Sequence, residues 1–335
     1  MLQACIPVTD ASQVGDVRRT TLRIANAAGF TEVRLGEIAI AVTELATNLA
    51  RHAVRGAVFV QHLRSGGADW LELLAVDSGP GINNLQRCLQ DGYSTAGTPG
   101  NGLGAIRRFS DEFDVFSTEA KGTVVLSRFK TNALQPPSPF VVGAISQPVA
   151  HEEACGDSWR VATSGDDVAV MVVDGLGHGV AAAEAADCAT AVFNDDPFAV
   201  DAAFYQRLHV KLLGTRGAAL ARAIVRSGQV SYSGVGNIAG CLIGLEQSRG
   251  LPSQNGIVGA ASPRVNTMPA YEWPSHGLLL MHSDGLLSRW SLSPYPGLVL
   301  KHPAIIAAVL ARDFSRGRDD VTVVAVRRND RSAAA

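Results

Sequence analysis

Five aspartates in the second half of this sequence stand at the edges of expected strands, where their carboxylates could bind divalent cations. They are Asp157 in CGDSW, Asp174 in VVDGLGHG, Asp284 in MHSDGLL, and Asp319 with Asp320 in GRDDVTVVAV. A single aspartate beside a strand is usually a turn former, but four such motifs with flanking glycines are hard to explain in that way. Few histidines and no paired cysteines accompany them, and such carboxylates suit hard cations such as Mg2+ or Mn2+. Two such ions can lower the pKa of a bridging water and hold a phosphoryl oxygen for in-line attack.

A second group of polar residues lies on an expected helix in the first half. Glu44 and Asn48 stand four residues apart in EIAIAVTELATNLARHA, so both can point into one site. A carboxylate can act as a general base, and an amide oxygen is a suitable ligand for Mg2+. Taken alone, the pair is better explained as an ordinary solvated helix face.

Two glycine-rich loops follow this helix and favour a nucleotide site. In AVDSGPGI, Asp77 ends a strand and precedes Gly79 and Gly81, so the backbone could approach a flat ligand. The Asp77 carboxylate could accept from an exocyclic amine such as that of adenine. In GTPGNGLGAIRR, free backbone N–H groups at the start of a helix could hold phosphate. That loop contains Gly100, Gly102 and Gly104.

The pattern of apolar residues predicts the elements that position these groups. Ile38, Val42, Leu45 and Leu49 recur at helical spacing and form an expected buried stripe. In the first half we expect strands at Ala4–Val8, Ala57–Leu63, Leu71–Val76, Glu112–Ser117 and Gly122–Phe129, helices at Ala11–Ala28 and Glu32–His52, and a short helix after Gly104. In the second half we expect strands at Val141–Ser146, Asp157–Ser164, Val168–Val173, Gly228–Ser233, Gly240–Leu245, Gly277–His282 and Val321–Val326, and helices at Val180–Val192, Phe198–Leu213 and Pro303–Asp313.

The clearest break in composition is NALQPPSPF, where three prolines within four residues cannot continue a helix or a central strand. It predicts an α+β chain with domains at 1–131 and 140–329, a Pro-rich linker at 132–139 and a tail at 330–335. The length of 335 residues suffices for two separate cores.

Charge and cysteine usage narrow the class of protein. The formal net charge is -2 and no basic block occurs, which gives little support to nucleic acid or an anionic membrane as a partner. The five cysteines are scattered without Cys-x-x-Cys spacing, which favours a reducing compartment. The first ten residues lack a secretory signal pattern, and no apolar run approaches the ~18 residues that would suggest a membrane span. We therefore expect a cytoplasmic protein, and its oligomeric state is not predicted.

The order TELATN, DSGPG and GNGLG resembles the N box and the two glycine boxes of the GHKL ATP-binding fold, over roughly Ala4 to Phe129. It looks most like the small anti-sigma and stressosome switch serine kinases, because DEFDVFSTEAKGT resembles their closing strands. The resemblance implies that Glu44 is the catalytic base, Asn48 binds Mg2+ and Asp77 contacts the adenine of ATP. It further implies that the ATP loops contain Gly79, Gly81, Gly100, Gly102 and Gly104. No P-loop motif occurs, and no preceding helix with a phosphoacceptor histidine is visible, which argues against a sensor histidine kinase.

The order GD-x-W, DGLGHG, SDGL and RDDVTVV resembles the metal-dependent serine/threonine phosphatases of type 2C, in their bacterial sporulation and stress-response branch. The match covers about Phe140 to Arg328 and implies two packed antiparallel sheets flanked by helices. It also implies two Mn2+ or Mg2+ ions, with Asp174 bridging both and supporting catalysis, and the Gly175 carbonyl completing one coordination sphere. The second ion would be bound by Asp157, Asp284 and Asp319, while Asp320 would support the surrounding shell.

The chain departs from the phosphatase pattern in two places. Many relatives carry histidine directly after the Asp-Gly pair, whereas this chain has Leu176, and His178 follows two residues later. We expect His178 to cap the helix that begins near Val180. The stretch SGVGNIAG replaces an Ala-Gly-His-x-Pro phrase that is common in the bacterial branch, and Gly236 with Asn237 could form a hairpin turn there.

Together the two resemblances imply a partner-switching regulator that joins an ATP-dependent serine kinase to a phosphoserine phosphatase. Its expected substrates are anti-sigma antagonist or stressosome proteins of the STAS type. An alternative is a phosphatase whose N-terminal domain binds ATP without catalysis, or sequesters a sigma factor or another switch protein.

Overall fold

The computed structural model describes residues 3–65, 68–89, 102–131, 138–260 and 270–329. Gly100, most of the Pro-rich stretch and the tail 330–335 lie outside the described residues. Contacts divide the chain into two compact units, one formed by Met1–Pro136 with Leu292–Arg312, the other by Pro137–Ser291 with Asp313–Ala335. A segment from the second half of the sequence therefore belongs to the first unit.

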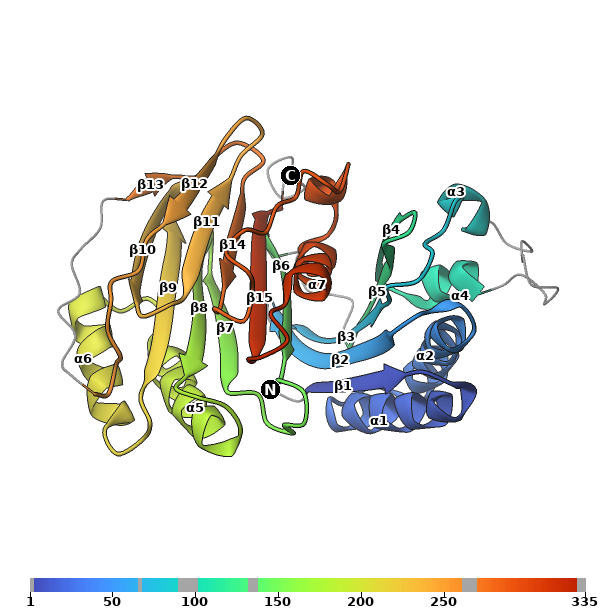
Figure 1. Ribbon diagram of the computed structural model, residues 1–335, viewed down its shortest axis with the longest axis horizontal. Coiled ribbons are helices and arrows are strands. Elements are labelled where there is room, and N and C mark those ends of the chain that lie inside the picture. The colour runs from blue at the N-terminus through green and yellow to red at the C-terminus, as the bar shows by residue number, and fades with distance from the viewer. Residues whose placement is uncertain (1–2, 66–67, 90–101, 132–137, 261–269, 330–335) are drawn as a thin grey trace. The chain divides into compact units, whose positions relative to one another are not determined.

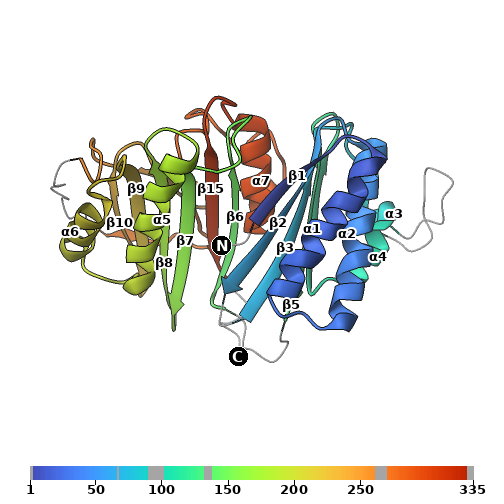
Figure 2. The ribbon, with the colours of Figure 1, turned by 90° about the horizontal axis from the view of Figure 1, so that it is seen from below.

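The first unit contains one five-stranded sheet, in which every pair of neighbouring strands is antiparallel. The strand order is β1-β2-β3-β5-β4. Helices α1 and α2 lie side by side on one face of this sheet (Figure 2). The N-terminal elements are β1 (Gln3–Val8), α1 (Val14–Ala27), α2 (Glu32–His52), β2 (Gly56–Ser65), β3 (Ala68–Val76), α3 (Leu85–Cys88), α4 (Gly102–Phe109), β4 (Glu112–Thr118) and β5 (Gly122–Lys130).

Helix α2 positions the first pair of candidate residues. The Thr31 side chain accepts from the backbone N–H of Arg34 at 3.4 Å and so caps the start of the helix. The predicted stripe is buried against α1 and the sheet, and consists of Ile38, Val42, Leu45 and Leu49. Glu44 and Asn48 lie on a different side of the helix from this stripe, and both are half-buried.

The other face of this sheet carries a row of charged and polar residues that are neighbours across four strands. Gln61 pairs with Glu72, Glu72 with Arg128, and Arg128 with Glu112. Glu72 is fully buried and forms an ion pair with Arg128 at 2.5 Å. A buried carboxylate of this kind requires its partner, because an unpaired charge away from water is very unfavourable.

Segment Leu292–Arg312, which includes most of α7 (Pro303–Phe314), is attached to the first unit by specific contacts. Asp114 on the edge strand β4 accepts from Lys301 Nζ at 2.9 Å and from the backbone N–H of His302 at 2.8 Å. The rings of Phe116 and Tyr295 meet edge to face, with centroids 6.5 Å apart. An ionic contact and an aromatic contact thus both attach the segment to β4.

The second unit contains two five-stranded sheets in which neighbouring strands run antiparallel (Figure 1). Their strand orders are β13-β10-β9-β8-β7 and β12-β11-β14-β15-β6. The elements are β6 (Phe140–Gln147), β7 (Asp157–Ser164), β8 (Asp167–Gly175), α5 (Val180–Asp195), α6 (Asp201–Leu212), β9 (Ala218–Arg226), β10 (Gln229–Val235), β11 (Ala239–Ile243), β12 (Ser248–Leu251), β13 (Tyr271–Glu272), β14 (Leu278–His282) and β15 (Val321–Arg328).

Helices α5 and α6 pack on the first of these sheets through a common core. That core contains Met171 and Val173 of β8, Ala185 and Phe193 of α5, and Phe204 of α6. Asp157 and Asp174 lie at paired ends of β7 and β8, so the core fixes the strands that carry two of the candidate ligands.

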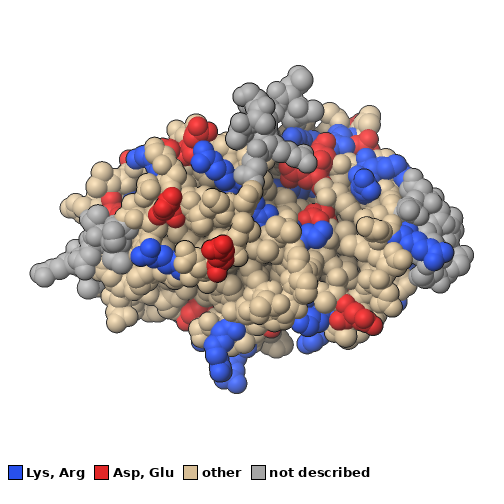
Figure 3. Space-filling view, turned by 90° about the horizontal axis from the view of Figure 1, so that it is seen from above, with Lys and Arg blue, Asp and Glu red and all other residues tan. Residues whose placement is uncertain are grey.

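The predicted α+β architecture is confirmed, with differences in detail. The central strand β9 was not predicted, nor were the short strands β12 and β13 or the short helix α3. The hairpin expected at Gly236 and Asn237 is wrong, because β10 and β11 belong to different sheets and these residues form the crossover between them. No helix among the described residues is long and apolar enough to cross a membrane. On the face shown in Figure 3, acidic and basic side chains are interspersed with uncharged surface.

Candidate active sites

The first candidate site brings Glu44, Asn48 and Gly102 together. A Cβ atom placed on Gly102 would lie 3.4 Å from Glu44 Oε2 and 3.5 Å from Asn48 Nδ2. The start of α4, with its free backbone N–H groups, therefore lies against the polar side of α2. A carboxylate that could act as a general base, an amide whose oxygen could bind a cation and a helix start that could bind an anion thus lie close together.

The Asp77 loop is closed by backbone and side-chain hydrogen bonds. The Gly79 N–H donates to Asp77 Oδ1 at 2.6 Å, and the Asp77 N–H donates to the Thr123 carbonyl at 3.0 Å. Burial raises the pKa of Asp77, although the Gly79 amide and the Arg312 guanidinium act in the opposite direction. The carboxylate is held in place by one oxygen, which leaves the other able to accept from a ligand amine.

Two glycines allow this loop to approach the β4–β5 hairpin closely. Gly81 has φ of 78°, and a Cβ there would lie 2.4 Å from the Thr118 carbonyl oxygen. Gly122 has φ of 88°, and a Cβ there would lie 2.0 Å from the Asp77 carbonyl oxygen. Both positions need glycine for backbone conformation and for space. Gly104 is buried in α4, and Gly100 lies outside the described residues.

Arg312, near the end of α7, also contacts this loop. Its Nη1 donates to the Asp77 carbonyl at 3.0 Å. The two residues are 235 positions apart in the sequence, and no local motif connects them. The candidate adenine contact is therefore supported by the segment Leu292–Arg312, which belongs to the same unit.

The second candidate site is built on the register of β7 and β8. Asp157 and Asp174 are direct cross-strand partners, so their side chains stand on the same face of the sheet. Ser283 Oγ donates to Asp157 Oδ2 at 2.5 Å and accepts from the Thr322 N–H at 3.0 Å. Asp157 is 4% exposed, and Ser283, which follows β14 of the other sheet, fixes its carboxylate.

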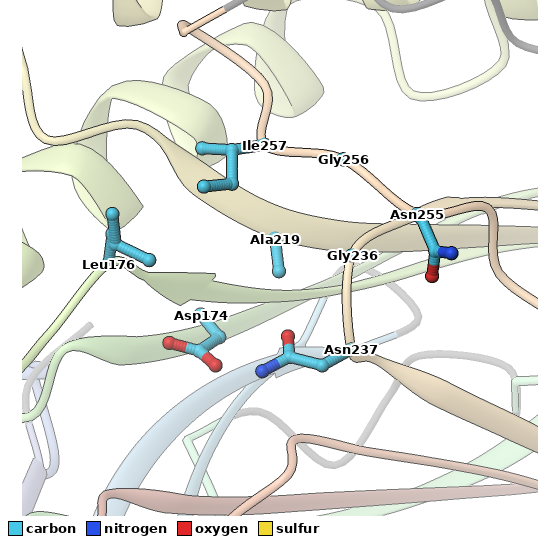
Figure 4. Close-up of a pocket in the computed structure, with 8 residues that line it drawn as sticks. All are labelled: Asp174, Leu176, Ala219, Gly236, Asn237, Asn255, Gly256 and Ile257. Atoms are coloured by element: carbon cyan, nitrogen blue, oxygen red, sulfur yellow. The ribbon is translucent and has the colours of Figure 1, made fainter.

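Asp284 and Asp319 reach the same region from the loop after β14 and the loop before β15. Asn237 Nδ2 donates to Asp284 Oδ2 at 2.7 Å, and its side chain also points toward Asp174 (Figure 4). The amide therefore lies between two carboxylates that would otherwise repel each other. Sequence reasoning missed this residue because Gly-Asn is an ordinary turn dipeptide.

Asp320 holds the neighbouring backbone in place. Its two oxygens accept from the N–H groups of Val149 at 2.6 Å and Gly156 at 2.5 Å. The Gly156 carbonyl in turn accepts from the Gly175 N–H at 3.0 Å. These bonds tie the strand ends that carry Asp157 and Asp174 to the loop that carries Asp319. A Cβ on Gly175 would lie 2.0 Å from the Ala182 carbonyl oxygen, so the approach of α5 requires glycine there.

The electrostatics of this cluster favour cation binding. Burial, and then the carboxylates of Asp284 and Asp319, raise the pKa of Asp174 to about 7. Burial and the charge of Asp174 raise the pKa of Asp157 well above its usual range, and burial raises that of Asp319, with Asp284 and Asp320 adding to it. Carboxylates that raise one another's pKa are stabilised when a cation neutralises their charge.

The set of donors is chemically suited to Mg2+ or Mn2+, because it consists of carboxylate oxygens supplied by several loops and strands. Among the described residues, no three His, Cys, Asp or Glu side chains lie close enough together to hold a metal ion as they stand.

His178 does not cap α5, and that prediction is wrong. The N-cap residue is Gly179, and no side chain caps the helix there. The His178 Nδ1 atom instead lies 2.7 Å from Glu152 Oε1. Glu152 also approaches the helix start, since a Cβ on Gly179 would lie 2.8 Å from Glu152 Oε2. A carboxylate is favoured at that position by the helix dipole.

Residues 6–129 match the family described as a histidine kinase-like ATPase domain. The serine/threonine-protein kinase RsbT of Bacillus subtilis (strain 168) is 31% identical over 123 residues, which make up 37% of this chain and 92% of that protein. The anti-sigma F factor of Caldanaerobacter subterraneus subsp. tengcongensis is 30% identical over 95 residues, which make up 27% of this chain and 66% of that protein.

Two solved structures resemble a larger share of this chain than the two relatives above. A chain of the structure described as "The bacterial stressosome: a modular system that has been adapted to control secondary messenger signaling" is 28% identical with a TM-score of 0.52, and the match covers 56% of this chain and 99% of that one. RsbX in complex with magnesium is 18% identical with a TM-score of 0.51, over 58% and 98% of the two chains. Since the first 131 residues are less than half of the sequence, both likenesses extend beyond them. The predicted pair of folds, a GHKL domain and a type 2C phosphatase domain, is confirmed.

Proposed function

We propose a function from the premise that this chain belongs to the histidine kinase-like ATPases, as a relative of the serine/threonine kinase RsbT. The chain joins that domain to a second one with the fold of type 2C phosphatases. We infer that the protein is a bifunctional partner-switching regulator, with an ATP-dependent serine kinase in residues 1–131 and a phosphoserine phosphatase in residues 140–329, acting in the cytoplasm.

In the kinase site, Glu44 would accept the proton of the substrate serine, and Asn48 would hold a Mg2+ ion that neutralises phosphate charge. Asp77 accepts from the adenine amine, and backbone N–H groups at the start of α4 hold phosphate. The loops are shaped by Gly79, Gly81, Gly100, Gly102 and Gly104. This assignment is supported by the position of Gly102, which lies against both Glu44 and Asn48.

In the phosphatase site, Asp174 would serve both of two Mn2+ or Mg2+ ions, and the Gly175 carbonyl would serve one of them. Asp157, Asp284 and Asp319 would hold the second. When bound, the ions supply a nucleophilic water at neutral pH and stabilise charge on the phosphoryl group. Asp320 and Ser283 keep the ligand-bearing backbone and the Asp157 carboxylate in position. The pairing of Asp157 with Asp174 across two strands carries this proposal.

The substrates we propose are small STAS-type antagonist or stressosome proteins, which the kinase would phosphorylate on serine and the phosphatase would restore. The likeness to RsbT and to a stressosome structure supports this class. An alternative is a phosphatase whose N-terminal domain binds ATP or sequesters a sigma factor without transferring phosphate. The likeness to an anti-sigma F factor favours that alternative.

The two activities can be tested separately. For the phosphatase, Asp174→Asn abolishes Mn2+-dependent phosphate release from p-nitrophenyl phosphate, whereas Asp166→Asn, at an exposed turn of the same unit, does not. Equal turnover by Asp174→Asn refutes the metal assignment.

For the kinase, labelled ATP, Mg2+ and a STAS-domain protein give phosphoserine with the wild type and with Glu32→Gln, which removes an exposed carboxylate from the same helix. Glu44→Gln gives none. If the wild type binds ATP but transfers no phosphate at any partner concentration, the non-catalytic alternative holds.

A further inference from the structure

A cavity of about 300 Å³ opens beside Asp174. It is lined by Asp174, Leu176, Ala219, Gly236, Asn237, Asn255, Gly256 and Ile257 (Figure 4). One of these residues is the proposed bridging ligand, so the cavity adjoins the point at which a phosphoryl group would be attacked. An inference about it rests on the proposed phosphatase activity and concerns how the substrate protein is held.

The outer wall of the cavity is a short strip of chain fixed at both ends. At one end, the Gly236 N–H donates to the Gln254 carbonyl at 2.7 Å, and the Gln254 N–H donates to the Gly234 carbonyl at 2.8 Å. At the other end, Val258 and Ala218 exchange two backbone hydrogen bonds of 2.9 and 3.0 Å. The strip is therefore held to the ends of β9 and β10 by one isolated bridge at each end.

The three residues between these anchors have unused hydrogen-bonding groups. Within the part of the chain that the structure describes, Asn255, Gly256 and Ile257 make no hydrogen bond through backbone or side chain. Asn255 and Gly256 are exposed. A fixed strip with unpaired N–H and C=O groups is a template on which an extended peptide can add as a further strand.

The side chains around the cavity differ in character from one side to the other. Leu176 and Ile257 provide an apolar side, and Leu176 is 47% exposed. Asn237 lies toward Asp174, and Asn255 presents a second amide farther away (Figure 4). An apolar side next to unpaired amides matches a peptide that offers its backbone to the strip and one aliphatic side chain to the wall.

We propose that this cavity binds the segment of the substrate protein next to the phosphoserine, in an extended conformation. The peptide backbone pairs with Asn255–Ile257 and with the Asn255 amide, while an aliphatic residue beside the phosphoserine packs between Leu176 and Ile257. The substrate class is therefore a phosphoserine protein whose modified serine lies in an exposed, extended segment with an aliphatic neighbour. Asn255 and Ile257 determine specificity and take no part in the chemistry.

The test compares two substrates of the full-length protein with Mn2+. One is p-nitrophenyl phosphate, which has no peptide backbone and no aliphatic side chain, and the other is a set of ten-residue phosphoserine peptides carrying leucine or aspartate before or after the phosphoserine. Asn255→Ala and Ile257→Ala each raise KM for the better leucine peptide about tenfold, the loss expected for one hydrogen bond or one apolar contact. They leave kcat for that peptide and turnover of p-nitrophenyl phosphate within about twofold.

Matched controls remove the same groups from other exposed positions of this unit. Asn194→Ala removes an exposed amide and Leu213→Ala an exposed aliphatic side chain, at 57% exposure, and neither changes KM. In a second probe, N-methylation of the peptide bond next to the phosphoserine removes one backbone donor and raises KM for the wild type.

The outcomes separate the two claims. Normal turnover of p-nitrophenyl phosphate with unchanged peptide KM in Asn255→Ala and Ile257→Ala overturns the binding site while leaving the phosphatase proposal intact. Equal losses on both substrates also overturn it, because they indicate damage to the catalytic centre. If the wild type turns over neither p-nitrophenyl phosphate nor any of the peptides, the phosphatase proposal is overturned and, with it, this inference.

Discussion

Replacing Asp174 with asparagine should stabilise the metal-free protein while abolishing phosphate release. Asp174 is held near Asp284 and Asp319, and burial together with these charges raises its pKa to about 7. In the absence of a cation, the ionised form is therefore unfavourable in the folded state. Asparagine has nearly the same shape and carries no charge, so it removes the unfavourable charge together with the proposed ligand.

The size of the effect follows from the difference between the folded and ordinary pKa values, about 7 and 3.8. Above pH 7 the carboxylate is ionised in both states, and the penalty in folding free energy is roughly 4 kcal/mol. At pH 5 it is ionised only in the unfolded state, and the penalty falls to less than half of that value. Because the folded pKa is raised, the wild type is free of this penalty below pH 4, where Asp174 is protonated in both states. The penalty grows as pH rises through 7.

The measurement is thermal unfolding in EDTA at pH 5 and pH 8, following the transition that Mn2+ shifts in the wild type. At pH 8, Asp174→Asn should unfold on the order of 10 °C higher than the wild type, and at pH 5 the gap should be less than half as large. Asp166→Asn, at an exposed turn, should show no gap. A variant that is no more stable than the wild type at pH 8, or a gap that does not change with pH, would refute the electrostatic reasoning.

Three further outcomes are expected. Gly122→Ala should lower the free energy of unfolding of the first unit by at least ~3 kcal/mol, because a Cβ there would lie 2.0 Å from the Asp77 carbonyl oxygen. Gly29→Ala, with φ of 82° and nothing within 4 Å, should lose only ~1 kcal/mol in the same denaturant titration, and equal losses would contradict the clash. Arg312→Ala should weaken binding of a fluorescent ATP analogue by about threefold to tenfold, since Arg312 supports the Asp77 loop. Arg289→Ala, at an exposed position, should not, and unchanged affinity in both would remove Arg312 from the nucleotide site. Binding of Mn2+ at pH 6 should release protons because the raised pKa values keep part of the cluster protonated. Calorimetric heats that do not depend on the ionisation enthalpy of the buffer would contradict that release.

Much of the fold could be predicted from local sequence. The bounds of α2 agree with the sequence prediction because Thr31 supplies a cap and the apolar stripe from Ile38 to Leu49 keeps helical spacing over about three turns. Strand β7 is similarly clear. By contrast, β9 has the sequence AALARAIVR, whose alanines favour a helix. It forms a strand because it pairs on both sides, with β8 and β10, and only tertiary structure reveals that pairing.

The residues that local sequence could not identify act over long separations. Asn237 resembles a turn former until its amide meets Asp284, 47 residues later. Helix α7 is recognisable as an apolar helix, yet nothing in its composition indicates that His302, the residue just before it, is held by Asp114 of β4, 188 residues earlier. Such contacts depend on which surfaces the fold brings together, and a single sequence does not encode them as a motif.

The claim that one chain carries opposed serine kinase and phosphatase activities is tested most directly by a phosphoserine time course. A STAS-domain protein is incubated with labelled ATP, Mg2+ and Mn2+ and either the wild type or Asp174→Asn. The account predicts that phosphoserine accumulates with Asp174→Asn, whereas the wild type holds it at a lower steady level while releasing labelled phosphate. Absence of phosphoserine with Asp174→Asn, or the same accumulation in both reactions, would contradict the account.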